Sequence, residues 1–581
     1  MRSLRLGLAQ LNPTVGDLDG NFEQIVAATG RARALGVEVL AFPELAITGY
    51  PPEDLLLHPA FVERAMQRTR DLVPHSAGLT LVVGAVERTI HEARREAELF
   101  DAAVVLHDGR WAGVYHKHHL PNYGVFDEKR YFAPGRGNAV FVRDVVTFGV
   151  SICEDIWFPG GPVGEQAEHG GAEVLLNLSA SPYHAGKAGE RRSMLRARAT
   201  DHRAIVAYVN LVGGQDEVLH DGASLILGPQ GELLAEGAMF EEDLIVADLD
   251  LDAVSSARQR APQRPGERAA RGARQLARVE LAVGAAGARP ALTARPIPVA
   301  RGPEAEVYDA LVLATRDYAR KNGFDTVVLG LSGGIDSALC ACIATDALGP
   351  QQVVGVSMPG PYSAGFSRED AEALCRALGL RFYVIPIADV FQSYGRALAP
   401  AFAGRASDIT EENLQARIRG NYLMALSNKY GWLVLTTGNK SETSVGYSTL
   451  YGDTAGGFAA LKDVYKTMVY RLARHRNGRS AAIPERTLTR PPTAELKPDQ
   501  RDQDSLPTYD VLDAILEAYV EEDRSVAEMV AAGHDEATVR RVMRMVDAAE
   551  YKRRQSPPGV KITPRAFGRD RRLPITNRWR G

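Results

Sequence analysis

Residues 326–337 read Thr-Val-Val-Leu-Gly-Leu-Ser-Gly-Gly-Ile-Asp-Ser. The apolar run stops at two glycines and is followed by a helical pattern, which predicts a strand, a tight loop and the start of a helix. Gly333 and Gly334 carry no Cβ, so the backbone can turn tightly and point successive amides at an anion. Ser332 and Ser337 add hydroxyl donors at the helix N-terminus, where the helix dipole favours negative charge. The stretch therefore predicts a phosphate-binding loop.

This loop differs from the common nucleotide-binding loop, which ends in Gly-Lys-Ser/Thr, a tripeptide that the chain lacks. It resembles instead the pyrophosphate loop of ATP pyrophosphatases, Ser-Gly-Gly-x-Asp-Ser. Those enzymes cut ATP between its α and β phosphates. The alternative, an ordinary glycine-rich turn, is disfavoured because every fixed position is matched between a strand and a helix. The resemblance implies ATP contacts from Gly330, Leu331, Ser332, Gly333, Gly334, Ile335, Asp336 and Ser337.

The size and composition of the chain are those of an ordinary globular protein. Its 581 residues, 45% hydrophobic and 24% charged, are too many for one core and suit two or three domains. No apolar run approaches the ~20 residues that cross a bilayer, and a strand pattern begins directly at Leu4. We therefore expect a cytoplasmic protein without membrane contact. The four cysteines are too few for a disulfide framework, and we expect Cys340 and Cys342 to lie in a core.

The charge of the chain is unevenly distributed. The net charge of −4 gives no bulk field for nucleic acid, so we expect no nucleic-acid partner. Between Lys552 and Arg580, however, the sequence holds ten Lys or Arg residues and only one acidic residue, Asp570. Such a cluster is either a solvated face or an anion-binding surface, and composition leaves both open.

The first ~250 residues alternate short β-rich runs with helical stretches, which predicts a layered α/β domain. Three of the runs end in reactive side chains, Glu44, Lys117 and Cys153. Glu44 could take the proton of the Cys153 thiol, the thiolate could attack an amide carbonyl, and Lys117 could stabilise the oxyanion. Water activated by Glu44 would then hydrolyse the thioester. Singly, each residue has a plainer interpretation, since a lone Glu or Lys is usually exposed and a lone Cys is usually a small core residue.

The sequences around these three residues resemble the nitrilase superfamily, whose catalytic residues are Glu, Lys and Cys in that order. The resemblance covers residues 1 to about 250 and implies a four-layer αββα sandwich. The form Leu120-Pro-Asn-Tyr-Gly-Val-Phe-Asp-Glu128 is typical of its glutaminase domains. By the same resemblance Tyr123, Ser181 and Lys187 would line the glutamine pocket, and Glu128 would orient Lys117. A plain polar loop is the alternative for 179–184.

The remaining chain divides into a linker and a second domain. Residues 255–298 are rich in Ala, Arg, Gly and Pro and have no sustained apolar period, which predicts a linker. The sequence leaves open whether its middle part, 275–283, is ordered against a domain. We therefore expect domains at 1–254 and 299–581. In the second, a helix from Glu304 and strands at 353–358, 382–387 and 432–436 predict a doubly wound parallel sheet with its ligand at the C-terminal strand ends.

The second domain resembles NAD synthetases in several motifs. They are Thr437-Gly-Asn-Lys-Ser-Glu442, Tyr451-Gly-Asp453, Tyr465-Lys-Thr467, Glu412-Asn-Leu-Gln-Ala-Arg417 and Asp502-Gln-Asp-Ser-Leu-Pro507. The whole chain then resembles the glutamine-dependent NAD synthetases, which adenylate the nicotinate carboxylate of deamido-NAD with ATP and displace AMP with ammonia. The resemblance implies Thr437 on ATP, Asn413, Glu442, Asp453, Lys466 and Lys552 on deamido-NAD, and Mg²⁺ on Asp336 and Glu442. The second acid that single-domain relatives carry shortly after Tyr-Gly-Asp is missing here, which leaves the nicotinate contact open.

Other functions remain to be distinguished. A stand-alone amidase with a nucleotide-sensing domain would predict a damaged loop, yet its polar residues are intact. A tRNA-modifying pyrophosphatase would predict a basic chain with aromatic stacking residues close together, whereas Tyr551, Phe567 and Trp579 are far apart. Another glutamine-dependent amidotransferase of the ATP pyrophosphatase class is the nearest alternative. For the ligase we also expect a protected ammonia tunnel and, from the single-domain relatives, a homo-oligomer.

Overall fold

The computed structural model describes residues 2–91, 96–260, 276–282, 289–293, 295–299 and 301–579. They fall into two compact units, one within Met1–Gln215 and His220–Ala300 and the other within Asp216–Leu219 and Arg301–Gly581. Much of the predicted linker, and Arg580 of the basic segment, lie outside the described residues. No helix in the described ranges is long and apolar enough to cross a membrane.

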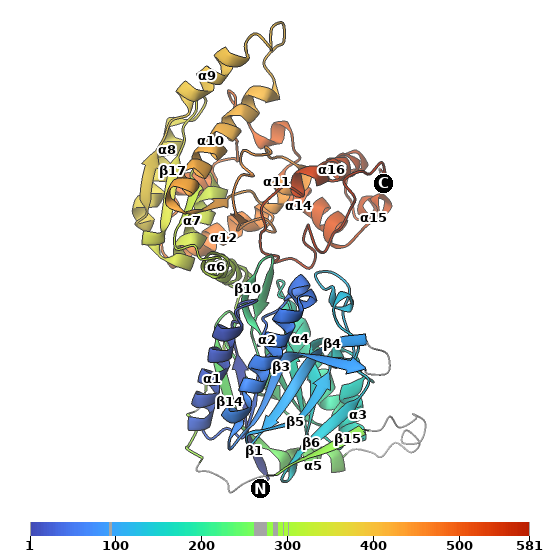
Figure 1. The fold of residues 1–581 in the computed structure, drawn as a ribbon. Coiled ribbons are helices and arrows are strands. Elements are labelled where there is room, and N and C mark those ends of the chain that lie inside the picture. Colours follow the sequence, from blue (N-terminus) through green and yellow to red (C-terminus); the bar gives the residue numbers. More distant parts are fainter. Residues whose placement is uncertain are drawn as a thin grey trace. The chain divides into compact units, whose positions relative to one another are not determined.

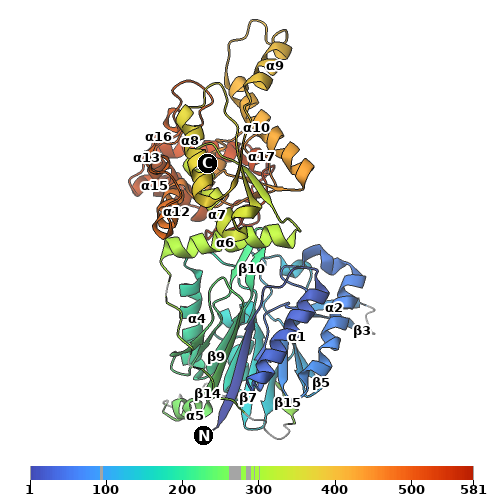
Figure 2. The ribbon, with the colours of Figure 1, turned by 90° about the vertical axis from the view of Figure 1, so that its left-hand side faces the viewer.

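The first unit contains a six-stranded sheet and a seven-stranded sheet (Figures 1 and 2). In the six-stranded sheet β1, β2 and β3 run parallel, and the other neighbours run antiparallel. Its strands are, in order, β14 (Asp243–Asp250), β1 (Ser3–Gln10), β2 (Val39–Ala41), β3 (Thr80–His91), β4 (Glu96–His107) and β5 (Arg110–His116).

The seven-stranded sheet is also mixed, with β7, β8 and β9 parallel at its centre. Its order is β13 (Leu233–Glu236), β12 (Leu225–Leu227), β9 (Ile205–Asn210), β8 (Val174–Ser179), β7 (Val146–Ile152), β6 (Asn138–Arg143) and β15 (Leu276–Leu281). The edge strand β15 lies in the middle of the interval that the sequence gives to a linker, and it pairs in parallel with β6. The segment that the sequence left open is thus part of the first unit.

Helices cover the outer face of each sheet, which confirms the predicted αββα sandwich. α1 (Leu18–Ala34) and α2 (Pro59–Asp71) lie side by side over the six-stranded sheet, where Ile25 and Val62 pack with Leu81 of β3 (Figure 2). α3 (Pro162–Glu168) and α4 (Lys187–His202) cover the other sheet, where Val163 and Leu195 pack with strand residues. Each helix thus buries one apolar stripe against a sheet face.

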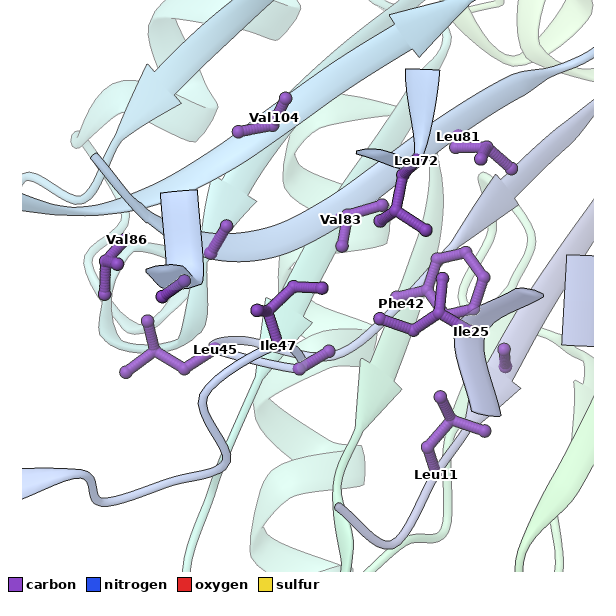
Figure 3. Packing of buried hydrophobic residues seen from close by; sticks show 14 of the residues in the cluster. Leu11, Ile25, Phe42, Leu45, Ile47, Leu72, Leu81, Val83, Val86 and Val104 are labelled. Carbon is purple, nitrogen blue, oxygen red and sulfur yellow. The ribbon is translucent and has the colours of Figure 1, made fainter. Parts of the chain in front are cut away.

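The two sheets share a core that follows from alternation along the strands. Alternate residues of β1 and β7 point to the same face of their sheets and meet between them: Leu4, Leu6 and Leu8, and Phe148, Val150 and Ile152. A separate cluster under α1 holds Phe42, Leu45 and Ile47 together with Ile25 and Val83 (Figure 3). Since the neighbours of Glu44 are anchored in this cluster, the backbone that carries Glu44 is fixed.

The second unit is built on a five-stranded parallel sheet, as predicted. Its order is β18 (Arg381–Val384), β17 (Val353–Ser357), β16 (Val327–Gly330), β19 (Leu433–Thr436) and β20 (Phe458–Ala459). The strand order reverses between β16 and β19, which is where doubly wound sheets bind their ligands. β18 ends at Val384 instead of the expected Ile387, because Pro386 has no N–H for the ladder.

Helices flank this sheet on both sides. α7 (Ile335–Leu348) begins at the phosphate-binding loop, and Cys340 and Cys342 on it are buried, as expected for core cysteines. α10 (Ile409–Tyr430) packs Ile418 and Leu423 against β16 and β19. The helices α14 (Tyr509–Leu516), α15 (Val526–Ala531) and α16 (Glu536–Ala548) form a core of their own near the C-terminus.

Two candidate active sites

Cys153 stands directly after β7, at the first position of a short 3₁₀ helix, Cys153–Trp157. Its side chain is buried, and its φ of +41° lies in the left-handed region that non-glycine residues rarely adopt. Such strain persists only where the surroundings impose it, and it is frequent at functional residues. The structure therefore places the thiol on a sharp turn at the carboxyl end of a central strand.

Asp155 explains how this turn is held. Its buried carboxylate accepts hydrogen bonds from the Ile152 N–H at 3.3 Å, the His119 N–H at 2.8 Å and the Tyr115 hydroxyl at 2.8 Å. It therefore connects the Cys153 turn to the segment that follows Lys117. The sequence motif contained Asp155, but we predicted no role for it.

Glu44 and Lys117 form a buried ion pair next to this turn. Lys117 Nζ donates to Glu44 Oε1 at 2.5 Å, and both side chains have no solvent exposure. The other oxygen of Glu44 accepts from the Ala180 N–H at 2.7 Å. Both carboxylate oxygens of Glu44 thus have hydrogen-bond donors.

Glu128 is the second carboxylate on Lys117. Its Oε1 accepts from Lys117 Nζ at 2.8 Å and from the Tyr50 hydroxyl at 2.9 Å. Burial raises the pKa of Glu128 to about 7, against the opposing effect of the Lys117 ammonium and with the support of the Glu44 carboxylate. Contact with Lys117 agrees with the orienting role expected for Glu128.

The Cys153 thiol lies in the field of these charged groups. Burial, and after it the Glu44 carboxylate, raise the pKa of the thiol well above its usual value, while Lys117 acts in the opposite sense. The thiol is therefore protonated at neutral pH and needs a base to become a nucleophile. Glu44, Lys117 and Cys153, which are far apart in the sequence, thus lie together as a carboxylate, an ammonium and a thiol.

The three residues expected at glutamine lie around this group in different environments. Tyr123 is 60% exposed, and its hydroxyl donates to Glu154 at 3.0 Å. Ser181 is buried, and its N–H donates to Asn210 at 2.9 Å. Lys187 begins α4 with its Nζ 4.8 Å from the ring centre of Trp157. Tyr123 and Lys187 thus reach solvent, whereas Ser181 belongs to the interior.

The second site is a cavity of about 610 Å³ in the second unit. Its walls come from the ends of β16, β17 and β19, from α10 and from the C-terminal region. The wall includes these residues of the predicted set: Gly330, Leu331, Ser332, Asn413, Thr437, Glu442, Asp453 and Lys552. The rest of the phosphate-binding loop, with Asp336 and Ser337, is outside this lining, and Asp336 is connected to it through Lys466 and Glu442.

The loop has the conformation that its glycines predict. Gly333 has a φ of +78°, and a Cβ there would lie 2.4 Å from the Ser367 carbonyl oxygen. Ser332 Oγ accepts from the Gly334 N–H at 3.2 Å, and the Ser337 hydroxyl donates to the Gly334 carbonyl at 3.0 Å. The loop is thus closed on itself at the N-terminus of α7, where anions bind.

An ion-pair cluster stands next to this loop. Lys466 Nζ donates to Asp336 Oδ2 at 2.5 Å and to Glu442 Oε1 at 3.1 Å. Asp336 Oδ1 accepts from the Asn439 amide at 2.9 Å. Burial raises the pKa of Glu442 to about 7, with Lys466 opposing and Asp336 supporting the shift. Two carboxylates thus converge on one position that holds positive charge.

Three residues expected at deamido-NAD converge on one turn, residues 446–449. Lys552 Nζ donates to the carbonyls of Gly446 and Ser448 at 2.7 and 2.8 Å. Asp453 accepts from the Thr449 N–H at 2.6 Å, and Asn413 accepts from the Thr449 hydroxyl at 2.7 Å. These side chains therefore shape the cavity wall as well as face into it.

Most cations of the basic C-terminal segment are paired within the protein. Arg554 contacts Glu550, Lys561 contacts Asp570 and Arg565 contacts Asp523. Within the described part of this segment, Lys552 is the cation that lines the cavity. The excess of positive charge in the segment thus serves mainly internal pairing, and of the two alternatives that composition left open, an anion-binding surface would depend on Lys552.

Arg419 lines the cavity, and the sequence analysis assigns it no role. It lies on α10, and its Nε donates to the Met358 carbonyl at 3.0 Å. Burial lowers the pKa of Arg419 to about 10, with a smaller opposing effect of Glu495. A desolvated guanidinium on a cavity wall suits an anionic or carbonyl-bearing ligand.

Comparisons with known proteins match both units. The model of the carbon-nitrogen hydrolase family matches residues 5–259, and the NAD synthase model matches residues 307–556. The glutamine-dependent NAD(+) synthetase of Thermotoga maritima is 48% identical, with 100% of both chains covered, and that of Acinetobacter baylyi is 44% identical, with 100% and 99% covered. The solved structure of the enzyme from Acinetobacter baumannii, in complex with ADP, is 42% identical, with a TM-score of 0.75 and 99% of both chains covered.

Proposed function

The chain belongs to the glutamine-dependent NAD(+) synthetase family, and on that basis we propose how its two sites divide the reaction. It is a ligase that makes NAD(+) from deamido-NAD, ATP and glutamine. The first unit supplies ammonia from glutamine, and the second unit activates deamido-NAD with ATP. The observation that supports this division most strongly is the buried contact of Lys117 with Glu44 beside the strained Cys153 turn.

Glutamine hydrolysis follows from the first site. Glu44 takes the proton of the Cys153 thiol, and the thiolate attacks the side-chain carbonyl of glutamine. The Lys117 ammonium stabilises the oxyanion that forms, and Glu44 passes the thiol proton to the amide nitrogen, so that ammonia leaves as the carbonyl closes to a thioester. Glu44 then deprotonates a water molecule that cleaves the thioester and releases glutamate. Tyr123, Ser181 and Lys187 hold the substrate from the positions described above.

Amide formation belongs to the second site. The nicotinate carboxylate of deamido-NAD attacks the α-phosphate of ATP, and pyrophosphate leaves into the loop of Ser332, Gly333, Gly334 and Ser337. Ammonia then attacks the acyl carbon of the adenylate, and AMP leaves. Thr437 contacts ATP, and Asn413, Asp453 and Lys552 contact deamido-NAD through the turn that they hold.

The cluster of Asp336 and Glu442 fits Mg²⁺. Both offer hard carboxylate oxygens of the kind that this ion prefers, and their ion pairs with the Lys466 ammonium support a position suited to positive charge. When bound there, Mg²⁺ would neutralise charge on the phosphates of ATP. Lys466 supplies a second positive charge to the transferring phosphoryl group.

The surface of the second unit supports a homo-oligomer. Tyr394, Ile409, Met424 and Tyr430 expose between 37% and 66% of their surface, although all four are large and apolar. They lie on or next to α9 (Ala388–Leu398) and α10. Self-association would remove these side chains from water. Sedimentation equilibrium tests this, and a monomer with full synthetase activity would contradict it.

The proposed roles of the two sites are tested by following the amide nitrogen of glutamine and the phosphates of ATP into the products. Glutamine labelled with ¹⁵N in its side-chain amide, deamido-NAD, ATP and Mg²⁺ should give NAD(+) with the label in its carboxamide. For each NAD(+) formed, at least one molecule each of glutamate, AMP and pyrophosphate should form. ADP and phosphate in place of AMP and pyrophosphate would contradict the adenylation step, and glutamate without NAD(+) would leave only an amidase.

A further inference from the structure

A third carboxylate stands beside Lys117, and the proposed mechanism does not use it. Asp101 lies in β4, between Phe100 and Ala102, and its side chain has no solvent exposure. Its backbone carbonyl accepts from the Lys117 N–H at 2.9 Å, and its Oδ2 is 3.6 Å from Lys117 Nζ. Asp101 therefore contacts Lys117 through both its backbone and its side chain.

The three acids are too close together to be treated separately. One oxygen from each of Glu44, Asp101 and Glu128 lies within 4.8 Å of the others, and all three side chains are buried. The charged groups that act on Asp101 are these two acids and Lys117, and Lys117 is in turn acted on by the Cys153 thiol. Three ionised carboxylates around one ammonium would leave a net charge of −2 away from water, which is costly.

The hydrogen bonds show which acid holds a proton most readily. Both oxygens of Glu44 accept hydrogen bonds, and one oxygen of Glu128 accepts two. Within the described residues, neither oxygen of Asp101 accepts from a donor, and the side chain that comes within hydrogen-bonding reach of Asp101 is the acidic one of Glu44. An ionised carboxylate without donors is the least stable of the three, and burial together with Glu44 raises the pKa of Asp101 well above its usual value.

We propose that Asp101 is a positioning residue of the glutaminase site that works as a neutral carboxylic acid. It supports Lys117 from the β4 side without adding a further negative charge to those of Glu44 and Glu128, which would compete for the ammonium. The charge of Lys117 then remains available to Glu44 and to the oxyanion. The proposal rests on the glutaminase assignment made above and adds to it the protonation state that the assignment requires.

Two substitutions separate this role from an ionic one and from a purely structural one. Asp101→Asn keeps the shape, one donor and one acceptor, so glutamine-dependent kcat/KM should stay within about threefold of the wild type, with an unchanged pH profile. Asp101→Leu keeps most of the volume but removes the polar group. Its kcat for glutamine should fall about 100-fold with little change in KM, because Lys117 is misplaced.

The proton on the Asp101 carboxyl group can be detected by infrared spectroscopy without catalytic turnover. At about pH 8 Glu128 is ionised, so the infrared difference spectrum of the full-length wild type minus Asp101→Asn should show the carbonyl band of a protonated carboxylic acid. Ionised-carboxylate bands in its place would overturn the proposal, as would a shift of about one unit or more in the pH profile of Asp101→Asn. Full activity of a folded Asp101→Leu would overturn the positioning role.

A failure of the glutaminase assignment would give a different set of results from a failure of the Asp101 proposal. Glu44→Gln and Cys153→Ala, measured beside the Asp101 variants, should both lose glutamine hydrolysis. If they kept it, the catalytic assignment would fail whatever the infrared result. If Asp101→Leu does not fold, the infrared spectrum and the pH profile of Asp101→Asn still decide the protonation state.

Discussion

Lys117 is the residue on which the first site depends most. Its ammonium is wholly buried and lies within hydrogen-bonding distance of two carboxylates, with a third at 3.6 Å. These neighbours raise the pKa of Lys117 well above its usual value although burial acts against them. Lys117 is therefore charged throughout the physiological pH range, and the titrating groups of the site are the acids around it.

Glu128 should make the stability of the first unit depend on pH. The pKa of Glu128 is raised from 4.5 to about 7 in the folded protein, mainly by burial. Its stabilising contribution is therefore full below pH 4.5 and is lost as the pH rises through 7. The free energy of unfolding should fall by up to about 1.4 kcal/mol per pH unit in this window, and less in Glu128→Gln.

Urea unfolding between about pH 5 and pH 8 measures this difference. Glu23→Gln is the matched control, because Glu23 is an exposed residue of α1 and should leave the pH dependence as it is in the wild type. A Glu128→Gln variant with the same slope as the wild type would show that Glu128 is already ionised at low pH.

At the scale of the element, the loop between β16 and α7 has one position that admits only glycine. Gly333→Ala places a Cβ 2.4 Å from a backbone oxygen at a φ of +78°. The substitution should cost at least about 1–2 kcal/mol of stability. It should also weaken ATP binding about tenfold or more, because the amides of the loop shift away from the phosphates. Calorimetric titration of ATP measures the loss.

Gly395→Ala is the control for this prediction. Gly395 lies within α9, and a Cβ there meets nothing within 4 Å. Alanine favours a helix over glycine by up to about 1 kcal/mol, so this variant should be as stable as the wild type or more so, with unchanged ATP affinity. Equal ATP affinities of the two variants would contradict the loop assignment.

The turn at 446–449 is the second element that decides binding. Lys552→Met removes two charge-assisted hydrogen bonds to its carbonyls, each worth roughly 1.5–3 kcal/mol. We expect the KM for deamido-NAD to rise about tenfold or more, with a smaller effect on ATP. Lys429→Met, at the exposed end of α10, is the control. Equal effects on both substrates would contradict a specific role of the turn.

The sequence predicted the elements that carry local patterns and missed those that depend on pairing. Glu44, Lys117, Cys153 and the glycine-rich loop each follow an apolar run, so their positions at strand ends could be predicted. Asp155 and Asp101 act through contacts with distant segments. An acid within the apolar run 99–106 was nevertheless a signal for Asp101, because unpaired acids are rarely buried.

Strand pairing also explains why part of the predicted linker, residues 276–281, forms the edge strand β15. The run Leu276–Leu281 alternates apolar and polar residues only from Ala277 to Leu281, inside an interval rich in Ala, Arg, Gly and Pro, so the sequence left its structure open. Residues 276–281 become a strand because β6 offers them a free edge in parallel register. The alternation of the run and the free edge of β6 together decide the structure there.

At the scale of the whole molecule, joining a glutaminase to an ammonia-consuming site implies that ammonia does not mix with the solvent, where most of it would be protonated and no longer nucleophilic. With unlabelled glutamine and ¹⁵N-ammonium below its own KM in the buffer, NAD(+) should carry little label. Isotope analysis of the carboxamide measures the fraction. Label at the level of the bulk ammonium would show that released ammonia exchanges freely.

The measurement that tests the central claim most directly is synthesis of NAD(+) by Cys153→Ala with two nitrogen sources. Deamido-NAD, ATP and Mg²⁺ are supplied with either glutamine or ammonium, and NAD(+) and AMP are followed together. The variant should lose glutamine-driven synthesis and keep ammonium-driven synthesis at the wild-type level, because the thiol is needed only to release ammonia. Retained glutamine-driven synthesis would contradict the role of Cys153, and no NAD(+) from the wild type with either source would contradict the assigned reaction.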